Sequence, residues 1–192
     1  MRADRELIHE YLEGSEEAFR TFYWRHRQAL FVYIVSIVHR RELAEEILQG
    51  TLVTFLRHLE RLDDRSNYRP WLLRVARSRC IDALRGEERH GRALKVHGER
   101  LRERRTGEGT HDLHGLGLSE EVARLLLDLP SEQREVLVLR GCLELTFAEI
   151  AEMTGVPENT AISRHRYGMA RVRRSLGRAE SPSEVKKHGR ER

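Results

Sequence analysis

Residues 146–174 read TFAEIAEMTGVPENTAISRHRYGMARVRR, and this stretch decides the fold of the C-terminal part of the chain. Thr146 and Glu149 have the spacing of a capping box. In that motif the Thr hydroxyl accepts a backbone N–H of the first helical turn, and the Glu carboxylate accepts the backbone N–H of the Thr. The sequence therefore predicts that a helix begins just after Thr146.

A tight turn and a second helix are expected directly after this first helix. Gly155 follows Ala151 by four residues, and a small residue and a glycine at that spacing allow two helices to cross closely. Pro157 favours the start of the next helix, because its fixed φ is helical and its missing N–H is not needed in the first turn. Together these signals predict a helix-turn-helix.

The second of these helices carries residue types that hydrogen-bond base edges and phosphates. The candidate contacts are Asn159, Thr160, Ser163, Arg164, Arg166 and Arg171, with Arg173 and Arg174 on the DNA backbone. From Pro157 to Arg178 there are six arginines against one acid, Glu158. The alternative interpretation is a solvated amphipathic helical hairpin, because such a pattern by itself is only a hypothesis.

A second basic run extends from Arg69 to Arg92. It holds seven arginines against three acids, Asp82, Glu87 and Glu88. Either nucleic-acid binding or a solvated helix face accounts for this run when it is taken alone.

The composition indicates a charged helical protein. Of 192 residues, 39% are hydrophobic and 34% charged, only four are proline, and the formal net charge is +4. No run of about 18 apolar residues is present, and the charged N-terminus lacks the apolar segment of a secretory signal. We therefore expect a cytoplasmic protein. Cys80 and Cys142 are far apart among apolar neighbours, so we expect both to be small buried side chains rather than a disulfide or a metal site.

Helical periodicity divides the chain into two all-α domains. Residues 4–86 are expected to form a bundle of about four helices, and residues 119–178 the helix-turn-helix domain, with Ser131 as a helix cap. Between them, residues 87–118 are rich in glycine, histidine and charge, and are predicted to be a flexible linker. Residues 179–192 are predicted to be a polar tail.

The two blocks together resemble a bacterial sigma factor of the sigma-70 family, of the extracytoplasmic-function type. The resemblance covers about residues 14–86 and 119–176, with its motifs in family order. They are Gly14–Phe19, Ala44–Gln49, Trp71–Arg85, Leu129–Arg140 and Glu149–Arg164. The resemblance implies a protein that binds core RNA polymerase and directs promoter-specific transcription initiation, with promoter DNA and an anti-sigma protein as further partners.

The resemblance also implies roles for residues of the first block. Glu45, Glu46, Leu48 and Gln49 correspond to the segment that docks on polymerase, although their sequence alone favours a solvated face. For the −10 element, the candidate contacts are Asn67 and Tyr68 on a flipped base, with Arg74, Arg77, Ser78 and Arg85 nearby. Trp71 is expected to be a core residue rather than a stacking platform for DNA.

Several positions depart from the family pattern. Gly50 stands where an acid is common, Ser78 where Asn is frequent, and Ile162 where Lys is usual. The missing Lys removes one phosphate contact from the reading helix, for which Arg166 and Arg171 can compensate.

Three other functions are open from the sequence. An enzyme is disfavoured, because the chain shows no nucleophile arrangement, phosphate loop or acid pair, and we expect neither a cofactor nor a metal. His111 and His114 have a metal-like spacing, but flexible surface histidines are the commoner explanation. A stand-alone helix-turn-helix regulator with an N-terminal sensor or dimerisation domain is the main alternative. A pure interaction protein is disfavoured by the arginine-rich helix.

Overall fold

The computed structural model describes residues 2–59, 62, 68–94 and 120–179. These residues form eight α-helices, and none of them lies in a β-strand. The predicted all-α fold class is therefore confirmed. Asn67, His111 and His114 lie outside the described residues, as do the C-terminal tail from residue 180 and most of the predicted linker.

Four helices make up the N-terminal half of the chain. They are α1 (Asp4–Leu12), α2 (Glu16–Val38), α3 (Arg41–His58) and α4 (Tyr68–Leu94). The long helix α2 contacts each of the other three, and α3 also packs along α4. This group, called the front helices below, matches the expected four-helix bundle.

An aromatic cluster holds the front helices together. Phe22 of α2 and Phe55 of α3 stack with ring centroids 5.0 Å apart, and Tyr68 of α4 meets both rings edge-on. All three side chains are buried. Offset and edge-to-face ring pairs add stabilisation beyond the area that they bury, so this cluster fixes where α4 starts.

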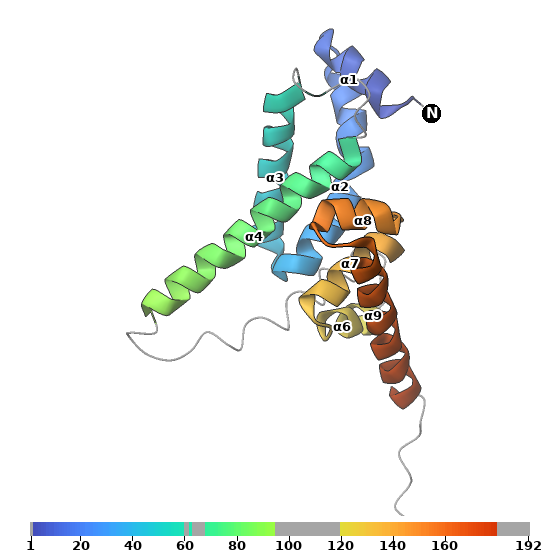
Figure 1. Cartoon of the computed structure of the whole chain (residues 1–192). Coiled ribbons are helices and arrows are strands. Elements are labelled where there is room, and N and C mark those ends of the chain that lie inside the picture. The colour runs from blue at the N-terminus through green and yellow to red at the C-terminus, as the bar shows by residue number, and fades with distance from the viewer. Residues whose placement is uncertain (1, 60–61, 63–67, 95–119, 180–192) are drawn as a thin grey trace, which may run out of the picture.

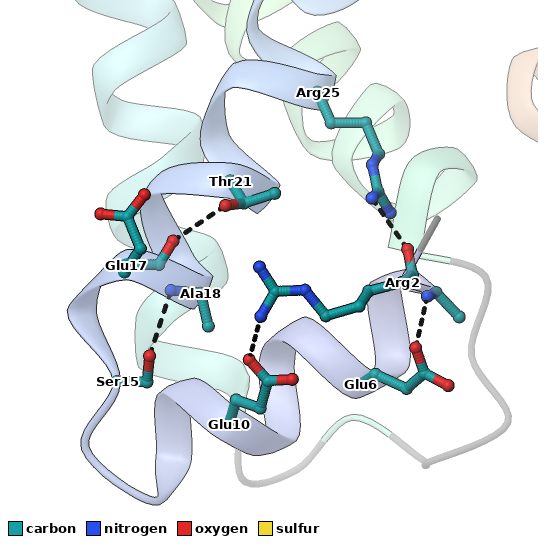
Figure 2. A network of polar contacts seen from close by, with 9 residues as sticks. Arg2, Glu6, Glu10, Ser15, Glu17, Ala18, Thr21 and Arg25 are labelled. Carbon is teal, nitrogen blue, oxygen red and sulfur yellow. Dashed lines mark hydrogen bonds and ion pairs between the residues drawn. The ribbon is translucent and has the colours of Figure 1, made fainter.

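Polar contacts attach α1 and the residues just before it to α2, and Figure 2 shows the one between Arg25 and Arg2. Arg25 donates to the backbone carbonyl of Arg2 over 2.8 Å and also pairs with Asp4. His26, which is buried, lies 2.7 Å from the second carboxylate oxygen of Asp4. Burial acts to raise the pKa of Asp4, but the hydrogen bonds and charges of His26 and Arg25 outweigh it, so the pKa is lowered. The Asp4 carboxylate is thus a charged anchor for α1.

The C-terminal half forms a second group, called the rear helices below. They are α6 (Glu120–Leu127), α7 (Ser131–Gly141), α8 (Phe147–Thr154) and α9 (Glu158–Ala179). The helix α9 contacts the other three. Ser131 was expected to cap α7, but Pro130 occupies the cap position and its carbonyl accepts the N–H of Gln133 over 3.0 Å.

The front and rear helices pack against each other. The middle of α7 lies against α2, and α8 lies beside α4, while the far ends of α4 and α9 extend away from this contact (Figure 1). The buried apolar residues of both groups belong to a single cluster. The helices that carry the two basic runs are therefore held in one arrangement.

The helix α4 is longer than expected. It continues through Gly86 to Leu94, eight residues past the end predicted for the first domain. Residues 87–94 are mostly strong helix formers, and an interior glycine costs a helix only about 1 kcal/mol. The linker predicted from composition to start at residue 87 therefore starts too early, because residues 87–94 belong to α4.

Candidate nucleic-acid interface

The capping box at the start of α8 is present as predicted. The hydroxyl of Thr146 accepts the backbone N–H of Glu149 over 3.2 Å, and the Glu149 carboxylate accepts the backbone N–H of Thr146 over 2.8 Å. These bonds to Thr146, the backbone one first, lower the pKa of Glu149. The helix-turn-helix therefore starts from a locally defined point.

The two glycines of this motif have different roles. Gly155 ends α8 with φ at +72°, and its N–H donates to the carbonyl of Ala151 over 2.9 Å. A Cβ there would meet nothing within 4 Å, so the left-handed backbone, and not the space for a close helix crossing, is the reason for glycine at position 155. The close approach occurs instead at Gly168 of α9, where a Cβ would lie 3.0 Å from Leu137 Cδ1.

The predicted reading residues lie on α9, the second helix of the motif. Asn159, Arg166 and Arg171 are exposed, as are Arg173 and Arg174; Thr160, Ser163 and Arg164 are half-buried. The Ser163 hydroxyl donates to the carbonyl of Asn159 over 2.8 Å, which leaves its oxygen available as an acceptor. Within the described part of the chain, the arginines of α9 make no ion pair.

Aromatic contacts seat α9 on the other rear helices. Phe147 of α8 meets the His165 ring edge-on at 5.4 Å, and the Arg140 guanidinium lies 5.5 Å from the centre of the same Phe147 ring. Burial, and then the charge of Arg140, lower the pKa of His165. A neutral His165 thus belongs to the scaffold behind the reading surface.

The second basic surface lies along α4. On an α-helix, Arg74, Arg77, Ser78 and Arg85 fall within a stripe about 100° wide. Arg74, Ser78 and Arg85 are exposed, whereas Arg77 is partly buried. The structure thus places four of the five predicted −10 residues of α4 on one face, whereas the fifth, Tyr68, is buried elsewhere.

Part of this α4 surface is occupied by the rear helices. Glu135 of α7 accepts a hydrogen bond from the Tyr33 hydroxyl over 2.7 Å and one from Arg77 Nε over 2.8 Å. Burial pulls the pKa of Arg77 down, but the hydrogen bond and charge of Glu135 outweigh it and raise that pKa. Burial and the Glu135 charge raise the pKa of Tyr33 well above its usual value, so its hydroxyl remains a donor.

Two further contacts join α4 to the rear helices. Arg74 pairs with Glu152 of α8 over 2.7 Å, and Arg69 donates to the backbone carbonyl of Leu143 over 2.7 Å. Sequence reasoning identified the arginines but missed Tyr33, Glu135 and Glu152. No local pattern could have found them, because each partner is far away along the chain.

The aromatic residues near the start of α4 are core residues. The Tyr68 side chain, which was predicted to contact a flipped base, is buried in this structure against Phe22 and Phe55. Trp71 packs at 5.7 Å from Phe55 and 5.9 Å from His58, which fits the core role expected for it. Asn67, the other predicted base contact, lies outside the described residues.

The predicted polymerase-binding segment lies on α3 and is only partly accessible. Glu46 and Gln49 are exposed, and Glu45 is half-buried beside Arg41, 3.2 Å away. Leu48, which was also predicted to contact polymerase, is buried in the core of this structure. Its place in the helical period puts it on the opposite face from Glu46.

Gly50 has a structural role in this chain. A Cβ there would lie 2.7 Å from a guanidinium nitrogen of Arg79, whose other nitrogen donates to the Thr54 hydroxyl over 2.7 Å. The absence of a side chain therefore lets Arg79 of α4 lie against α3. An acidic side chain, which is common at this position in the family, would displace Arg79 from this contact.

The two cysteines differ in environment. Cys80 is buried, and burial raises the pKa of its thiol to about 12. Cys142, which was expected to be buried, is exposed because it follows the last turn of α7. Among the described residues, no group of three or more metal-binding side chains occurs. No helix in that part of the chain is long and apolar enough to cross a membrane.

A helical chain with two separate basic helices, one of them in a helix-turn-helix, is typical of a DNA-binding protein. Residues 22–90 match the family model for Sigma-70 region 2, and residues 119–172 match Sigma-70, region 4. The chain belongs to the sigma-70 family and is a promoter-directing sigma factor of the extracytoplasmic-function type.

Individual relatives agree with this assignment. The chain is 31% identical over 174 residues to the ECF RNA polymerase sigma factor SigC of Mycobacterium tuberculosis (strain CDC 1551 / Oshkosh), covering 91% of this chain and 85% of SigC. It is 26% identical over 168 residues to the RNA polymerase sigma factor CarQ of Myxococcus xanthus, covering 88% and 94%. The stand-alone regulator, the main alternative from the sequence, is therefore not supported.

Solved structures share the fold. The sigma factor RpoE, crystallised with the anti-sigma factor NepR from Bartonella quintana, has a TM-score of 0.67 at 20% identity, covering 83% of this chain and 96% of that one. CnrH, in complex with the cytosolic domain of CnrY, has a TM-score of 0.65 at 23% identity, covering 94% and 100%.

Proposed function

We propose that this sigma factor binds core RNA polymerase through α3 and reads its promoter with α4 and α9. The observation that carries this proposal is the placement of the two basic helices. Each lies in a different one of the two regions that match the family. A protein that must read two elements on one promoter needs two such surfaces.

The helix α9 reads the −35 element in the proposed arrangement. Its N-terminal half would enter the major groove, where Asn159, Thr160, Ser163 and Arg164 face base edges and nearby phosphates. Arg166 and Arg171, with Arg173 and Arg174, would hold the DNA backbone. The exposure of these arginines on one long helix supports this part of the proposal.

The helix α4 holds the −10 element as an opened strand. Extracting a base from the duplex costs a few kcal/mol, which protein contacts must offset. Arg74, Arg77 and Arg85 would bind phosphates and Ser78 would make a polar contact, while Asn67 stays a candidate for the base itself. The shared stripe on α4 supports these roles.

Core polymerase is bound by the exposed face of α3, with Glu46 and Gln49 at its centre and Glu45 at its margin. The predicted domain of the front helices, residues 4–86, and that of the rear helices, residues 119–178, are joined by the predicted linker, residues 87–118. Each of these two domains is called a module here. Binding of one module then raises the effective concentration of the other at its own target.

The remaining parts of the proposal follow from the same role. The chain acts without catalysing a reaction, and it works where bacterial transcription takes place, in the cytoplasm. An anti-sigma protein is a further partner, in line with the complexes formed by RpoE and CnrH.

Reconstituted transcription tests the proposed function. Purified chain is added to core polymerase, and run-off products are mapped on promoters selected from a random library. We expect a defined start site with a shared pair of upstream elements. Random initiation, the same as with core polymerase alone, would contradict the function.

Glu46→Arg tests the polymerase-binding surface. We expect retention on immobilised core polymerase to fall about tenfold or more, because an exposed acid at an interface becomes a repulsive cation. Glu16→Arg makes the same change at an exposed position on α2 and serves as the control. Equal retention of both variants would remove Glu46 from the interface.

A further inference from the structure

One large apolar side chain is exposed among the polar residues of the reading helix. Ile162 of α9 is 40% exposed. Single exposed apolar residues are common on protein surfaces, so exposure by itself assigns no role. The position of Ile162 is more informative, because it lies three residues after Asn159 and four before Arg166, and residues at these spacings share one face of an α-helix. Ile162 therefore belongs to the surface that is proposed to enter the major groove.

The packing of α9 on the other rear helices fixes the direction of this side chain. Ala161, the preceding residue, is fully buried. Gly168 lies so close to α7 that a Cβ there would be 3.0 Å from Leu137 Cδ1. Ala161 and Gly168 are seven residues apart and so mark the same side of the helix. Turning α9 about its axis would break both contacts, so Ile162 is held at the exposed side.

Tyr167, the second exposed large hydrophobic residue in the described part of α9, already has a partner. Its side chain is 56% exposed, but the Arg166 guanidinium lies 5.2 Å from the centre of the ring. A cation over an aromatic face is attracted to the ring, which restricts where the cation lies. Tyr167 thus holds Arg166, one of the residues proposed to bind the DNA backbone. Ile162 differs, because its aliphatic surface can only make apolar contacts.

The major groove offers a single apolar group to such a side chain. Each base pair presents hydrogen-bond donors and acceptors there, and thymine adds its C5 methyl group. An isoleucine placed against donors and acceptors would remove their water without replacing the hydrogen bonds, which is unfavourable. Placed against a methyl group, it removes two apolar surfaces from water, which is favourable. The chemistry of Ile162 therefore fits thymine.

We propose that Ile162 is a specificity-determining residue that contacts the C5 methyl group of a thymine in the −35 element. This inference rests on the proposed function, because it assumes that α9 enters the major groove there. The contact removes about one methyl group from water, which favours thymine over a base without that group by about fourfold. Ser163 and Arg164, the next two residues, supply the polar part of the recognition.

Replacing thymine by deoxyuridine tests the contact, because the two bases differ only in the C5 methyl group. The chain is bound to core polymerase and offered two promoter duplexes with different fluorophores in competition. One duplex carries thymine and the other deoxyuridine at a single position of the −35 element, and each thymine of either strand is tested in turn. We expect the original chain to prefer thymine about fourfold at one position, and Ile162→Ala to show no preference there.

Folding does not confuse this test, because alanine is a better helix former than isoleucine and the site is exposed. Val53→Ala is the matched control. It shortens an apolar side chain on α3 that is 45% exposed, and we expect it to keep the preference for thymine. If Ile162→Ala keeps the preference as well, or if the original chain shows none at any position, the proposal is overturned.

Thr160→Ser separates Ile162 from the other methyl group near the groove. Thr160 is half-buried on α9, and its γ-methyl is an alternative partner for thymine. We expect the serine variant to keep the preference for thymine over deoxyuridine. Loss of the preference in Thr160→Ser, with its retention in Ile162→Ala, would assign the methyl contact to Thr160 and overturn the proposal.

Selection of promoters from a random library gives a second readout. The original chain should enrich thymine at the position identified by competition, whereas Ile162→Ala should accept cytosine there as well. The same base frequencies for both chains at every −35 position would count against Ile162.

Run-off transcription with core polymerase separates this inference from the proposed function. If the original chain selects start sites but does not distinguish thymine from deoxyuridine, the inference fails and the function stands. If the original chain selects no start site, the proposed function itself fails.

Discussion

The helices α4 and α9 carry similar excesses of arginine but present them differently. On α4, two of the proposed DNA-binding arginines are paired with acids from the rear helices, whereas on α9 the described residues show no such pairing. Charge counted along a sequence therefore does not reveal which positive charges a DNA strand can reach. The pairing, which only the tertiary structure creates, decides that.

The strongest test of this difference removes the arginine side chains of α9 that are proposed to bind DNA phosphates. We expect Arg171→Ala, Arg173→Ala and Arg174→Ala combined to weaken binding of the free chain to −35 duplex more than any single change. The slope of log affinity against log salt should fall by about three, about one for each lost phosphate contact. Fluorescence anisotropy at several salt concentrations measures both quantities.

The matched control is Arg74→Ala with Arg77→Ala on α4. In the free chain these arginines are engaged by Glu152 and Glu135, so the affinity for −35 duplex should stay the same. An equal loss of affinity for −35 duplex in the α9 and α4 variants would show that the arginines of the two helices are equally available to DNA.

A single change on the reading surface sharpens the comparison. Arg164→Ala should abolish −35-dependent initiation while leaving retention on core polymerase intact, through a loss of about 1–3 kcal/mol in DNA binding. Run-off transcription and a polymerase pull-down measure the two effects. Arg20→Ala, at an exposed position on α2, is the control, and unchanged transcription by Arg164→Ala would exclude this residue from promoter reading.

The cap of α8 sets how firmly the reading helix is presented. Thr146→Ala removes the side-chain acceptor for Glu149 N–H and should lower the free energy of unfolding by about 1 kcal/mol. Thermal or urea unfolding measures this loss. Thr146→Ser keeps the hydroxyl and should restore most of the stability; if it were as unstable as the Ala variant, the cap would not be the cause.

The smallest expected effect depends on pH. The pKa of His165 in the folded chain lies below its ordinary value of 6.5. Above pH 6.5 the ring is neutral in both states and adds no penalty. As the pH falls further, the unfolded chain takes up the proton first, so stability is lost until the folded pKa is passed. The stability of His165→Gln should therefore depend less on pH between pH 7 and 5 than the stability of the original chain, as measured by urea unfolding at several pH values.

Local motifs could be predicted from the sequence, but their tertiary partners could not. The Thr146 capping box depends on residues three apart, and the structure reproduces it. The Tyr33–Glu135 contact joins residues 102 apart, and nothing local encodes it. The same limit explains why the burial of Leu48 and Tyr68 was not expected, since a family motif indicates which segment matters but the packing of the helix decides which side chains face outward.

The missing side chain at Gly50 has a mechanical consequence, because it lets Arg79 of α4 lie directly against α3. Because a guanidinium from α4 lies across Gly50 and bonds Thr54, the helix proposed to grip polymerase and the helix proposed to hold the opened strand are braced side by side. We therefore expect a partner that moves α3 to move α4 with it. In the proposed function, binding of polymerase and binding of the opened DNA strand are then mechanically coupled through the contact that Gly50 permits.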